Sequence, residues 1–253
     1  MNDKKHEFWN ERASLGHVAG SNDFILKELE IRQLTELIPT GADVLDIGCG
    51  NGDTLVHLAK EKKIKGTGVD FAENMVALAQ TSARNQRLDA HLRFLNGKVP
   101  GLPAALGTFD TIITERCLIN LDGEAAQKQA FDEIIGRLKP GGRYLMMESF
   151  IEGLDRTNEL RARFGLEKIL PPWHNTFFHE QAVANWASDR VHLAQVIPYS
   201  STYHFLSRVI YAKVAAERGE PLRYDSDINV MSLKLPIVGD FGPARLYVWE
   251  RLV

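Results

Sequence analysis

The apolar residues of the chain alternate between short continuous runs and longer runs with helical spacing. The first helical run extends from about Asn22 to Ile38, where apolar residues recur on one face. Ser21 is suited to cap the start of this helix, and Pro39-Thr40-Gly41 predicts its end. The segment therefore predicts one amphipathic helix ahead of the first strand.

From residue 44 to residue 148 the pattern becomes a regular alternation of strands and helices. Strands are predicted over Val44–Ile47, Lys65–Val69, Leu92–Leu95, Phe109–Thr114 and Arg143–Glu148. Helices are predicted between most of them, notably over Asn74–Arg84 and Gly123–Leu138, and Lys139-Pro140-Gly141-Gly142 is a strong stop signal after the second. Strands that alternate with helices are typical of a parallel sheet with helices on both faces. The sequence therefore predicts a doubly wound α/β fold.

After Glu148 the spacing becomes irregular. The predicted elements are a charged helix over Leu154–Phe164, a loop over Pro171–Asn175, a short helix over Glu180–Ser188, and strands over His192–Ile197 and Arg245–Glu250. No proline- or serine-rich linker separates this part from the first. We therefore expect a single domain over residues 1–253.

Three glycines at alternate positions, Gly48, Gly50 and Gly52, follow the first strand and precede a helix. Glycines there let the backbone turn sharply and let a ligand approach the main chain. The dinucleotide-binding fingerprint needs glycine or alanine at position 53, where this chain has Asp53, and a second acid, Asp46, precedes the loop. A loop flanked by acids suits a cationic ligand better than a pyrophosphate.

Asp70 ends the second predicted strand. An acid at this distance from a glycine loop accepts hydrogen bonds from the two hydroxyls of a ribose. Taken alone, Asp70 could equally cap the following helix. In combination with the glycine loop, it predicts a ligand-binding site.

Four segments resemble the successive motifs of the class I S-adenosylmethionine-dependent methyltransferases of the small-molecule type: VLDIGCGNG, GTGVDFAENM, FDTIITERCLINL and GRLKPGGRYLMMES. The resemblance covers about Asp43 to Ser149, in the order of the family. It implies a seven-stranded, mostly parallel, Rossmann-like sheet whose last strand is antiparallel. It also implies an N-terminal helical lid (1–40), a cofactor-binding core (41–150), and a substrate-side insertion after the fifth strand followed by the C-terminal strands (151–253).

The activity that this resemblance implies is methyl transfer from S-adenosylmethionine to an oxygen or nitrogen of a small molecule, with S-adenosylhomocysteine as product. The cofactor supplies the activated methyl group, and the protein positions it. No metal-ligand pattern stands out. Two alternatives stay open: a non-catalytic protein that binds S-adenosylmethionine, and an NAD(P)-dependent oxidoreductase, which Asp46 and Asp53 disfavour.

The resemblance further implies a set of cofactor-binding residues: Asp46, Gly48, Gly50, Gly52, Asp70, Phe71, Met75 and Glu115. The glycines would line the methionine and ribose portions, Asp46 would lie near the amino group, and Asp70 would bind the ribose. The two apolar side chains would pack beside the adenine, and Glu115 would face the sulfonium side.

Adenine recognition departs from the family pattern after the third strand. The family often has Gly-Asp-Ala there, whereas this chain has Asn96-Gly97-Lys98-Val99. Lysine offers no hydrogen-bond acceptor, so adenine recognition would depend on backbone atoms or on Asn96. In the N-terminal lid, Arg12 could pair with the cofactor carboxylate, or it could be a solvated arginine.

The substrate pocket is expected at the carboxyl edge of the sheet. Arg116 could bind an anionic group or pair with a neighbouring carboxylate, and Trp173-His174-Asn175 lies in the insertion where family members build their pockets. His174, Glu115 and Glu148 are the candidate bases, because a hydroxyl acceptor must lose a proton. A structural histidine and a helix-capping Glu148 are the alternative interpretations.

The composition excludes some classes of binding partner. The 253 residues carry 33 acids and 30 Lys and Arg, a formal charge of −3, which gives no electrostatic footprint for nucleic acid or an anionic membrane. Only two cysteines are present, and the N-terminus has no apolar stretch of a secretory signal. We therefore expect a cytoplasmic protein with a small-molecule substrate and no nucleic-acid or membrane partner. No feature of the sequence predicts an oligomeric state.

Overall fold

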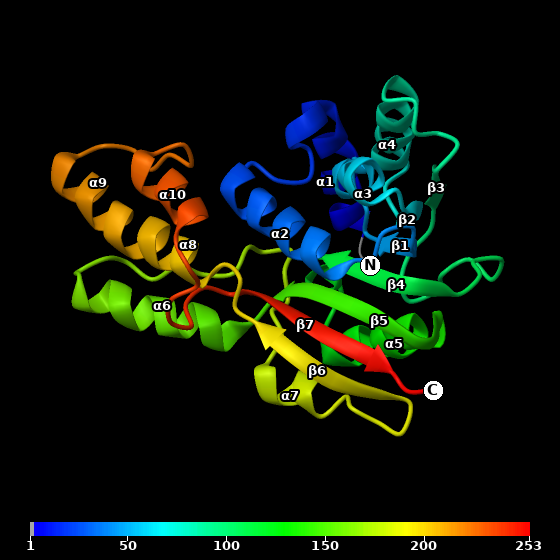
Figure 1. Ribbon diagram of the computed structural model, residues 1–253. Coiled ribbons are helices and arrows are strands. Elements are labelled where there is room, and N and C mark those ends of the chain that lie inside the picture. Colours follow the sequence, from blue (N-terminus) through cyan, green and yellow to red (C-terminus); the bar gives the residue numbers. More distant parts are fainter. Residues whose placement is uncertain (1–2) are drawn as a thin grey trace.

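Seven strands form one sheet in the order β3-β2-β1-β4-β5-β7-β6 in the computed structural model, which describes residues 3–253 (Figure 1). The strands are β1 (Asp43–Ile47), β2 (Lys65–Asp70), β3 (Leu92–Asn96), β4 (Phe109–Glu115), β5 (Leu138–Ser149), β6 (Val191–Ile197) and β7 (Ala244–Arg251). β1 to β5 pair in parallel, and β7 runs antiparallel to both β5 and β6. The predicted seven-stranded doubly wound sheet is confirmed.

Helices cover both faces of this sheet (Figure 1). The α-helices are α1 (Asp3–Arg12), α2 (Phe24–Leu37), α3 (Asp53–Lys62), α4 (Glu73–Asn85), α5 (Glu124–Gly136), α6 (Ile151–Arg163), α7 (Glu180–Ala184), α8 (Ser201–Phe205), α9 (Ala212–Arg218) and α10 (Asp227–Met231). The short or irregular helices are η1 (Ala13–Val18), η2 (Leu118–Asn120), the π-helical η3 (Leu206–Tyr211) and η4 (Ser232–Lys234).

Alternate strand residues supply two separate cores. Val44 and Ile113 pack in one buried cluster with residues of α2, α3 and α4. Their chain neighbours Leu45 and Ile112 pack in the other, with residues of α5. Successive side chains of a strand point to opposite faces of the sheet, so fully apolar strands require a helix layer on each side.

The start of α2 differs from the sequence prediction. Asp23 is the N-cap, and its carboxylate accepts a hydrogen bond from the backbone N–H of Leu26 at 3.1 Å. Ser21 instead accepts a hydrogen bond from the N–H of Asp23 at 3.1 Å. The prediction of Ser21 as the cap was wrong because the aspartate, two residues later, satisfies the free donors of the helix.

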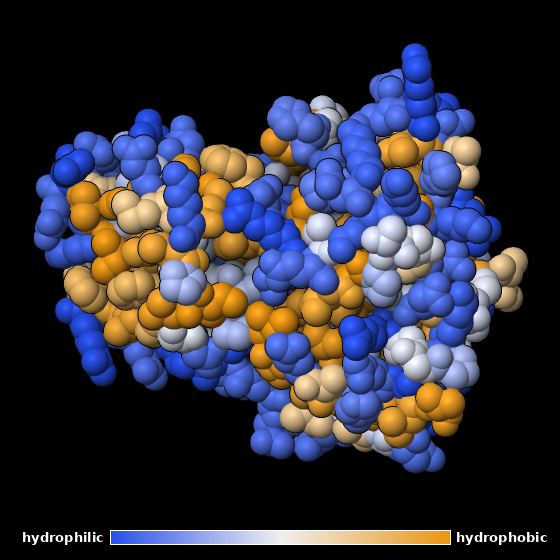
Figure 2. Space-filling model, in the orientation of Figure 1, coloured by the Kyte–Doolittle hydropathy of each residue, from blue (hydrophilic) through white to orange (hydrophobic). Residues whose placement is uncertain are grey.

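Two helical insertions separate the last three strands in the sequence. The predicted insertion after β5 contains α6 and α7. A second insertion, over residues 198–243 between β6 and β7, contains α8 to α10, and no sequence pattern indicated it. Figure 2 shows apolar surface gathered over this second insertion, where the exposed large side chains are Leu222, Tyr224, Val230, Met231, Leu235, Ile237 and Val238.

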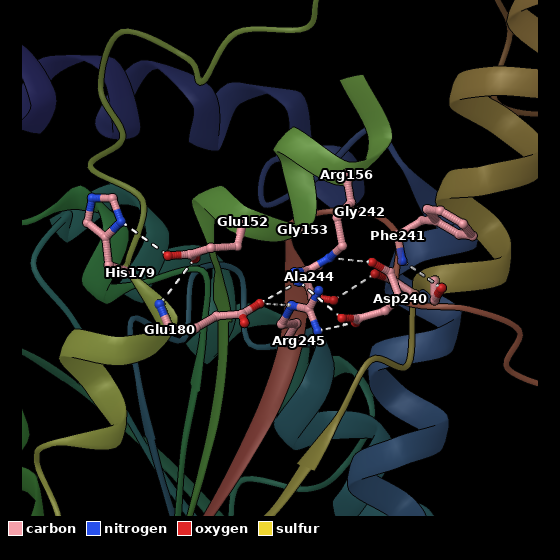
Figure 3. Close-up of polar contacts among 12 residues, drawn as sticks. Glu152, Gly153, Arg156, His179, Glu180, Asp240, Phe241, Gly242, Ala244 and Arg245 are labelled. Atoms are coloured by element: carbon pink, nitrogen blue, oxygen red, sulfur yellow. Dashed lines mark hydrogen bonds and ion pairs between the residues drawn. The ribbon is translucent and has the colours of Figure 1, made fainter. Parts of the chain in front are cut away.

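An ionic cluster fixes the end of the second insertion (Figure 3). Arg156 of α6 pairs with Glu180 of α7 at 2.6 Å and with Asp240 at 3.1 Å. The buried Arg245 at the start of β7 pairs with the same two carboxylates. Buried arginines need such partners because an unpaired charge away from water is costly. The cluster therefore joins α6 and α7 to the segment that enters β7.

Within residues 3–253, no helix combines the length and the apolar character needed to cross a membrane. Met1 and Asn2, which belong to the predicted lid, lie outside the described residues.

Candidate functional site

A cavity of about 370 Å³ opens at the carboxyl ends of β1, β2 and β4. Its walls come from the glycine loop, from α1 and α2, from the turn after β4, and from the loop between α6 and α7. The carboxyl ends of parallel strands are where open α/β sheets bind their ligands. The cavity brings together segments that are distant in the sequence.

The glycine loop forms the floor of the cavity. Gly48, Gly50 and Gly52 all have positive φ values, of 77°, 51° and 78°. A Cβ atom on Gly48 would lie 2.5 Å from the Sγ of Cys117, so a side chain at position 48 does not fit. The loop therefore exposes its backbone to the cavity as the sequence predicted.

Asp70 holds the loop in place. One carboxylate oxygen accepts a hydrogen bond from the N–H of Gly50 at 2.9 Å, and the other accepts one from the N–H of Ala72 at 2.9 Å. Burial raises the pKa of Asp70, and these backbone donors act in the opposite direction. Each carboxylate oxygen keeps a second lone pair, and Asp70 lines the cavity.

Buried charges occupy one end of the cavity. Lys27 of α2 donates to Glu115 at 2.7 Å and also to Thr54. Asp46 is 1% exposed, and one of its carboxylate oxygens has no hydrogen-bond partner in the part of the chain that the structure describes. Burial, and then the negative charge of Glu115, raises the pKa of Asp46 well above its usual value. An unpaired buried carboxylate of this kind is satisfied by a cationic ligand.

Arg116 belongs to the same charged end. Its guanidinium donates to the fully buried Glu30 of α2 at 3.1 Å, and the hydroxyl of Tyr199 donates to the other oxygen of Glu30 at 3.2 Å. Of the two interpretations of Arg116, the structure shows the pairing with a carboxylate, although Arg116 still lines the cavity. The sequence analysis missed Lys27 and Glu30, and their only signal was charge on the apolar side of α2.

Aromatic side chains surround His174 at the other end. Its ring centroid lies 4.9 Å from that of Phe8, 6.0 Å from Trp9 and 5.3 Å from Trp173. Burial, and then the charges of Lys5 and Arg12, lowers the pKa of His174, so the ring is neutral at neutral pH. The Nδ1 atom of His174 and the Oδ1 atom of Asn175 are buried and have no hydrogen-bond partner within residues 3–253.

Helix α1 closes this end of the cavity. The ammonium of Lys5 donates to the backbone oxygen of Asn120 at 2.8 Å and to Asp122 at 2.7 Å. The indole N–H of Trp9, which lines the cavity, donates to the side chain of Asn120 at 3.4 Å. These contacts place α1 over the turn that follows β4.

Several predicted residues lie away from the cavity. Arg12 donates to the backbone oxygens of Val18 and Ala19 and to the side chain of Asn22. These contacts hold its guanidinium, and Arg12 does not line the cavity. Trp173 is 65% exposed and lies behind His174 rather than in the wall. The predicted pairing of Arg12 with a cofactor carboxylate therefore has no support in this conformation.

The adenine side is only partly as predicted. Phe71 and Met75 line the cavity, but Asn96, Gly97, Lys98 and Val99 do not. The Asn96 amide instead donates to the backbone oxygens of Asp70 and Phe71 at 3.2 Å and 3.0 Å. Asn96 is therefore used to hold the end of β2, not to line the cavity.

Glu148 also lies outside the cavity lining. It is fully buried, and its carboxylate accepts hydrogen bonds from the N–H groups of Cys117, Leu118 and Ile119 at 3.1, 2.9 and 3.3 Å. Glu148 thus caps η2, as the alternative interpretation expected, and the interpretation as a base lacks access to the cavity.

This buried cap predicts a pH-dependent stability. Burial raises the pKa of Glu148 from 4.5 to about 7, so the folded protein holds this proton more tightly than the unfolded chain. The free energy of unfolding therefore decreases as the pH rises through this range, with about 2 kcal/mol of the change between about pH 5 and pH 7.5. Urea unfolding measures it, with Glu148→Gln as the variant that cannot ionise. An identical pH dependence in both proteins contradicts the prediction.

Among the described residues, no group of three or more His, Cys, Asp or Glu side chains is arranged to hold a metal ion. Lys27 instead pairs with Glu115 and Arg116 with Glu30, while Asp70 accepts from backbone N–H groups and Asp53 from the Asn51 amide.

Residues 44–142 match a family model described as a methyltransferase domain. These residues form a methyltransferase domain. The matched residues include the glycine loop, Asp70 and Glu115, which are the parts of the cavity that the four motifs predicted.

Two curated relatives and one solved structure illustrate the similarity. A demethylmenaquinone methyltransferase of Lactiplantibacillus plantarum is 36% identical over 114 residues, which are 44% of this chain and 47% of the relative. An O-methyltransferase of Aspergillus nomiae is 27% identical over 132 residues, 52% of this chain and 57% of the relative. The chain thus matches about half the length of these curated relatives.

The geranyl diphosphate C-methyltransferase of Streptomyces coelicolor has the same fold, with a TM-score of 0.60 at 16% identity over 90% of this chain and 77% of the other. That structure contains Mg²⁺, geranyl-S-thiolodiphosphate and S-adenosyl-L-homocysteine.

Proposed function

We propose that this protein binds S-adenosylmethionine in the cavity and transfers the methyl group to an oxygen or nitrogen of a small molecule. The observation that carries the proposal is Asp70, which fixes Gly50 and faces the cavity with free acceptor lone pairs. A carboxylate in this position suits the two hydroxyls of a ribose. The methyltransferase relatives support the reaction class.

The charges of the cavity fit this cofactor. Its charged end contains three acids, Glu30, Asp46 and Glu115, and two bases, Lys27 and Arg116. S-Adenosylmethionine has an ammonium, a carboxylate and a sulfonium, which leave one net positive charge. Asp46 has a free oxygen for the ammonium, and Lys27 is the cation that reaches the cavity from α2. The site therefore offers an acid for the excess positive charge.

The cofactor supplies a methyl group already activated by the sulfonium. The protein orients the acceptor and, for a hydroxyl, removes its proton. The glycine loop and Asp70 would hold this cofactor, and its methyl group would be the electrophile that the acceptor oxygen attacks. His174 takes the hydroxyl proton and releases it to solvent. Among the three candidate bases, His174 and Glu115 line the cavity, and Glu115 is already paired with Lys27.

The predicted lid (1–40), core (41–150) and substrate side (151–253) form part of this proposal. The lid prediction is supported by α1, which contributes Trp9 to the cavity wall. The cavity of about 370 Å³ supports a small-molecule substrate. The cytoplasmic location stays a prediction.

Isothermal titration calorimetry tests the cofactor. We expect saturable binding of S-adenosylmethionine and S-adenosylhomocysteine, and no measurable binding of NAD at the same concentrations, because Asp46 and Asp53 oppose a pyrophosphate. Tight NAD binding without a response to S-adenosylmethionine overturns the assignment. Binding of S-adenosylmethionine without release of S-adenosylhomocysteine across a broad acceptor panel favours the non-catalytic alternative.

A further inference from the structure

The two ends of the cavity differ in charge. The buried ion pairs Lys27–Glu115 and Glu30–Arg116 lie at the end near Asp46. The other end is lined by Trp9, Asn120, Pro172, His174, Asn175 and Phe177, which are uncharged at neutral pH. The cofactor and the acceptor therefore meet different chemical surroundings.

None of the charged side chains near Asp46 affects the pKa of His174 at the other end of the cavity. The charges that lower the pKa of His174 are those of Lys5 and Arg12 in α1. Neither side chain lines the cavity: Lys5 is paired with Asp122, and Arg12 is bonded to Val18 and Ala19. An ionised acceptor in this part of the cavity would lose its hydration without gaining an ion pair, which is costly.

Two buried polar atoms are available for one hydrogen-bond donor. The Oδ1 atom of Asn175 and the Nδ1 atom of His174 have no partner among the described residues. An amide oxygen only accepts, and a neutral imidazole presents one accepting nitrogen. Buried acceptors without a donor are uncommon in folded proteins, so their presence in a cavity wall points to a ligand O–H or N–H group.

Flat aromatic rings surround His174, some of them behind the cavity wall. Phe8 lies at 33° to the ring of His174, with 4.9 Å between the centroids, and Trp9 and Trp173 meet it edge-on at 86° and 79°. Trp9 and Phe177 face the cavity itself. Rings held in this way pack best against another flat apolar surface.

We propose, as a step that rests on the function proposed above, that the acceptor is an uncharged compound with a flat apolar body. It donates one hydroxyl or amine hydrogen to His174 or Asn175 at the neutral end of the cavity. A phenol-type hydroxyl or an aromatic amine has this chemistry, whereas carboxylated, phosphorylated and ammonium-bearing acceptors do not. Asn175 is the residue that sets this preference.

Three matched probes test the charge preference: 2-naphthol, 6-hydroxy-2-naphthoic acid and 6-(aminomethyl)-2-naphthol. They share one ring system and one hydroxyl, and at neutral pH they are neutral, anionic and cationic. We expect the neutral probe to give a kcat/KM for S-adenosylhomocysteine release at least about tenfold above either ion, equivalent to about 1.4 kcal/mol. Calorimetric titration of the three probes into the complex with S-adenosylhomocysteine should rank their affinities in the same order, without turnover.

Asn175→Asp tests the assigned residue, because it adds one negative charge with almost no change of shape. We expect this variant to lose affinity for the anionic probe and to bind the cationic probe at least as well as the neutral one. Asn85→Asp is the matched control, since Asn85 is exposed at the end of α4 and does not line the cavity. The control keeps the preference of the unaltered protein.

The outcomes separate this inference from the proposed function. Equal values for the three probes, a preference for either ion, or no binding of any probe to a protein that binds S-adenosylhomocysteine overturns the inference and leaves the cofactor assignment in place. The absence of S-adenosylmethionine and S-adenosylhomocysteine binding overturns both. An unchanged preference in Asn175→Asp overturns the role of Asn175.

Discussion

Asp70→Ala lowers the affinity for S-adenosylmethionine about ten- to a hundred-fold, which corresponds to about 1.5–3 kcal/mol for a lost charged hydrogen-bond acceptor. The carboxylate contributes to binding directly, by contact with the ligand, and indirectly, through the glycine loop. The carboxylate faces the cavity, and it also fixes the N–H of Gly50 at 2.9 Å, so its removal loosens the loop that forms the floor. Calorimetric titration of the folded variant measures the loss.

Asp70→Ser separates ligand binding from capping. A serine hydroxyl can still accept from the N–H of Ala72, which Asp70 now does at 2.9 Å, but it cannot span both Gly50 and a ribose. We expect the serine variant to keep most of the thermal stability and to lose nearly as much affinity as the alanine variant. Full cofactor affinity in either variant shows that Asp70 only caps the following segment.

The sheet and the cofactor side of the cavity were predictable from the sequence because they depend on local patterns. Short apolar runs between helices specify buried parallel strands, and Val44–Ile47 lies within the observed β1. The glycines of the loop were predictable because the chain needs positive φ there, and position 48 has no room for a side chain. Both features depend on near neighbours in the chain.

The charged end of the cavity was not predictable in the same way. Lys27 and Glu30 come from α2, and they meet Glu115 and Arg116 only when α2 packs against the sheet. Charge on the apolar side of α2 was their only signal in the sequence, and it does not identify the partners. A contact across more than eighty residues leaves no local pattern in one sequence.

Glu148 as a base and Arg12 as the partner of the cofactor carboxylate lack support for a related reason. The end of a strand predicts that a side chain lies at the ligand edge of the sheet, but not whether backbone donors already use it. Three N–H groups of the turn after β4 occupy the carboxylate of Glu148. Backbone oxygens of η1 and the residue after it similarly engage Arg12. Competition from the backbone decides between capping and catalysis at such positions.

The insertion over residues 198–243 was not predicted from the sequence for a different reason. Its helices are short, and the π-helical turn over Leu206–Tyr211 breaks the usual helical period. The segment is instead fixed by long-range contacts, such as those of Tyr203 and Arg208 with Asp23 at 2.7 Å and 2.9 Å. Asp23 thus caps α2 and anchors the insertion at the same time.

His174→Ala is expected to lower kcat for a hydroxyl acceptor by 10²–10⁴-fold, the range for loss of a general base, while the affinity for S-adenosylmethionine stays nearly unchanged. The two effects separate because His174 lies at the neutral end of the cavity, and no charge of the cofactor end acts on it. Its Nδ1 atom is buried and has no partner among the described residues, so a nitrogen is available for the acceptor proton. Single-turnover kinetics measure the chemical step.

The pH profile distinguishes a base from a wall residue. Burial lowers the pKa of His174 from 6.5, so the activity of the unaltered protein should fall only below about pH 6.5, as the imidazole becomes protonated. His174→Gln keeps a polar side chain of similar size and should lose this acidic limb together with most of the rate. His179→Ala is the control, because His179 is exposed and outside the cavity lining. A loss below tenfold in both His174 variants, with the acidic limb retained, means that His174 shapes the cavity and that the acceptor loses its proton to water.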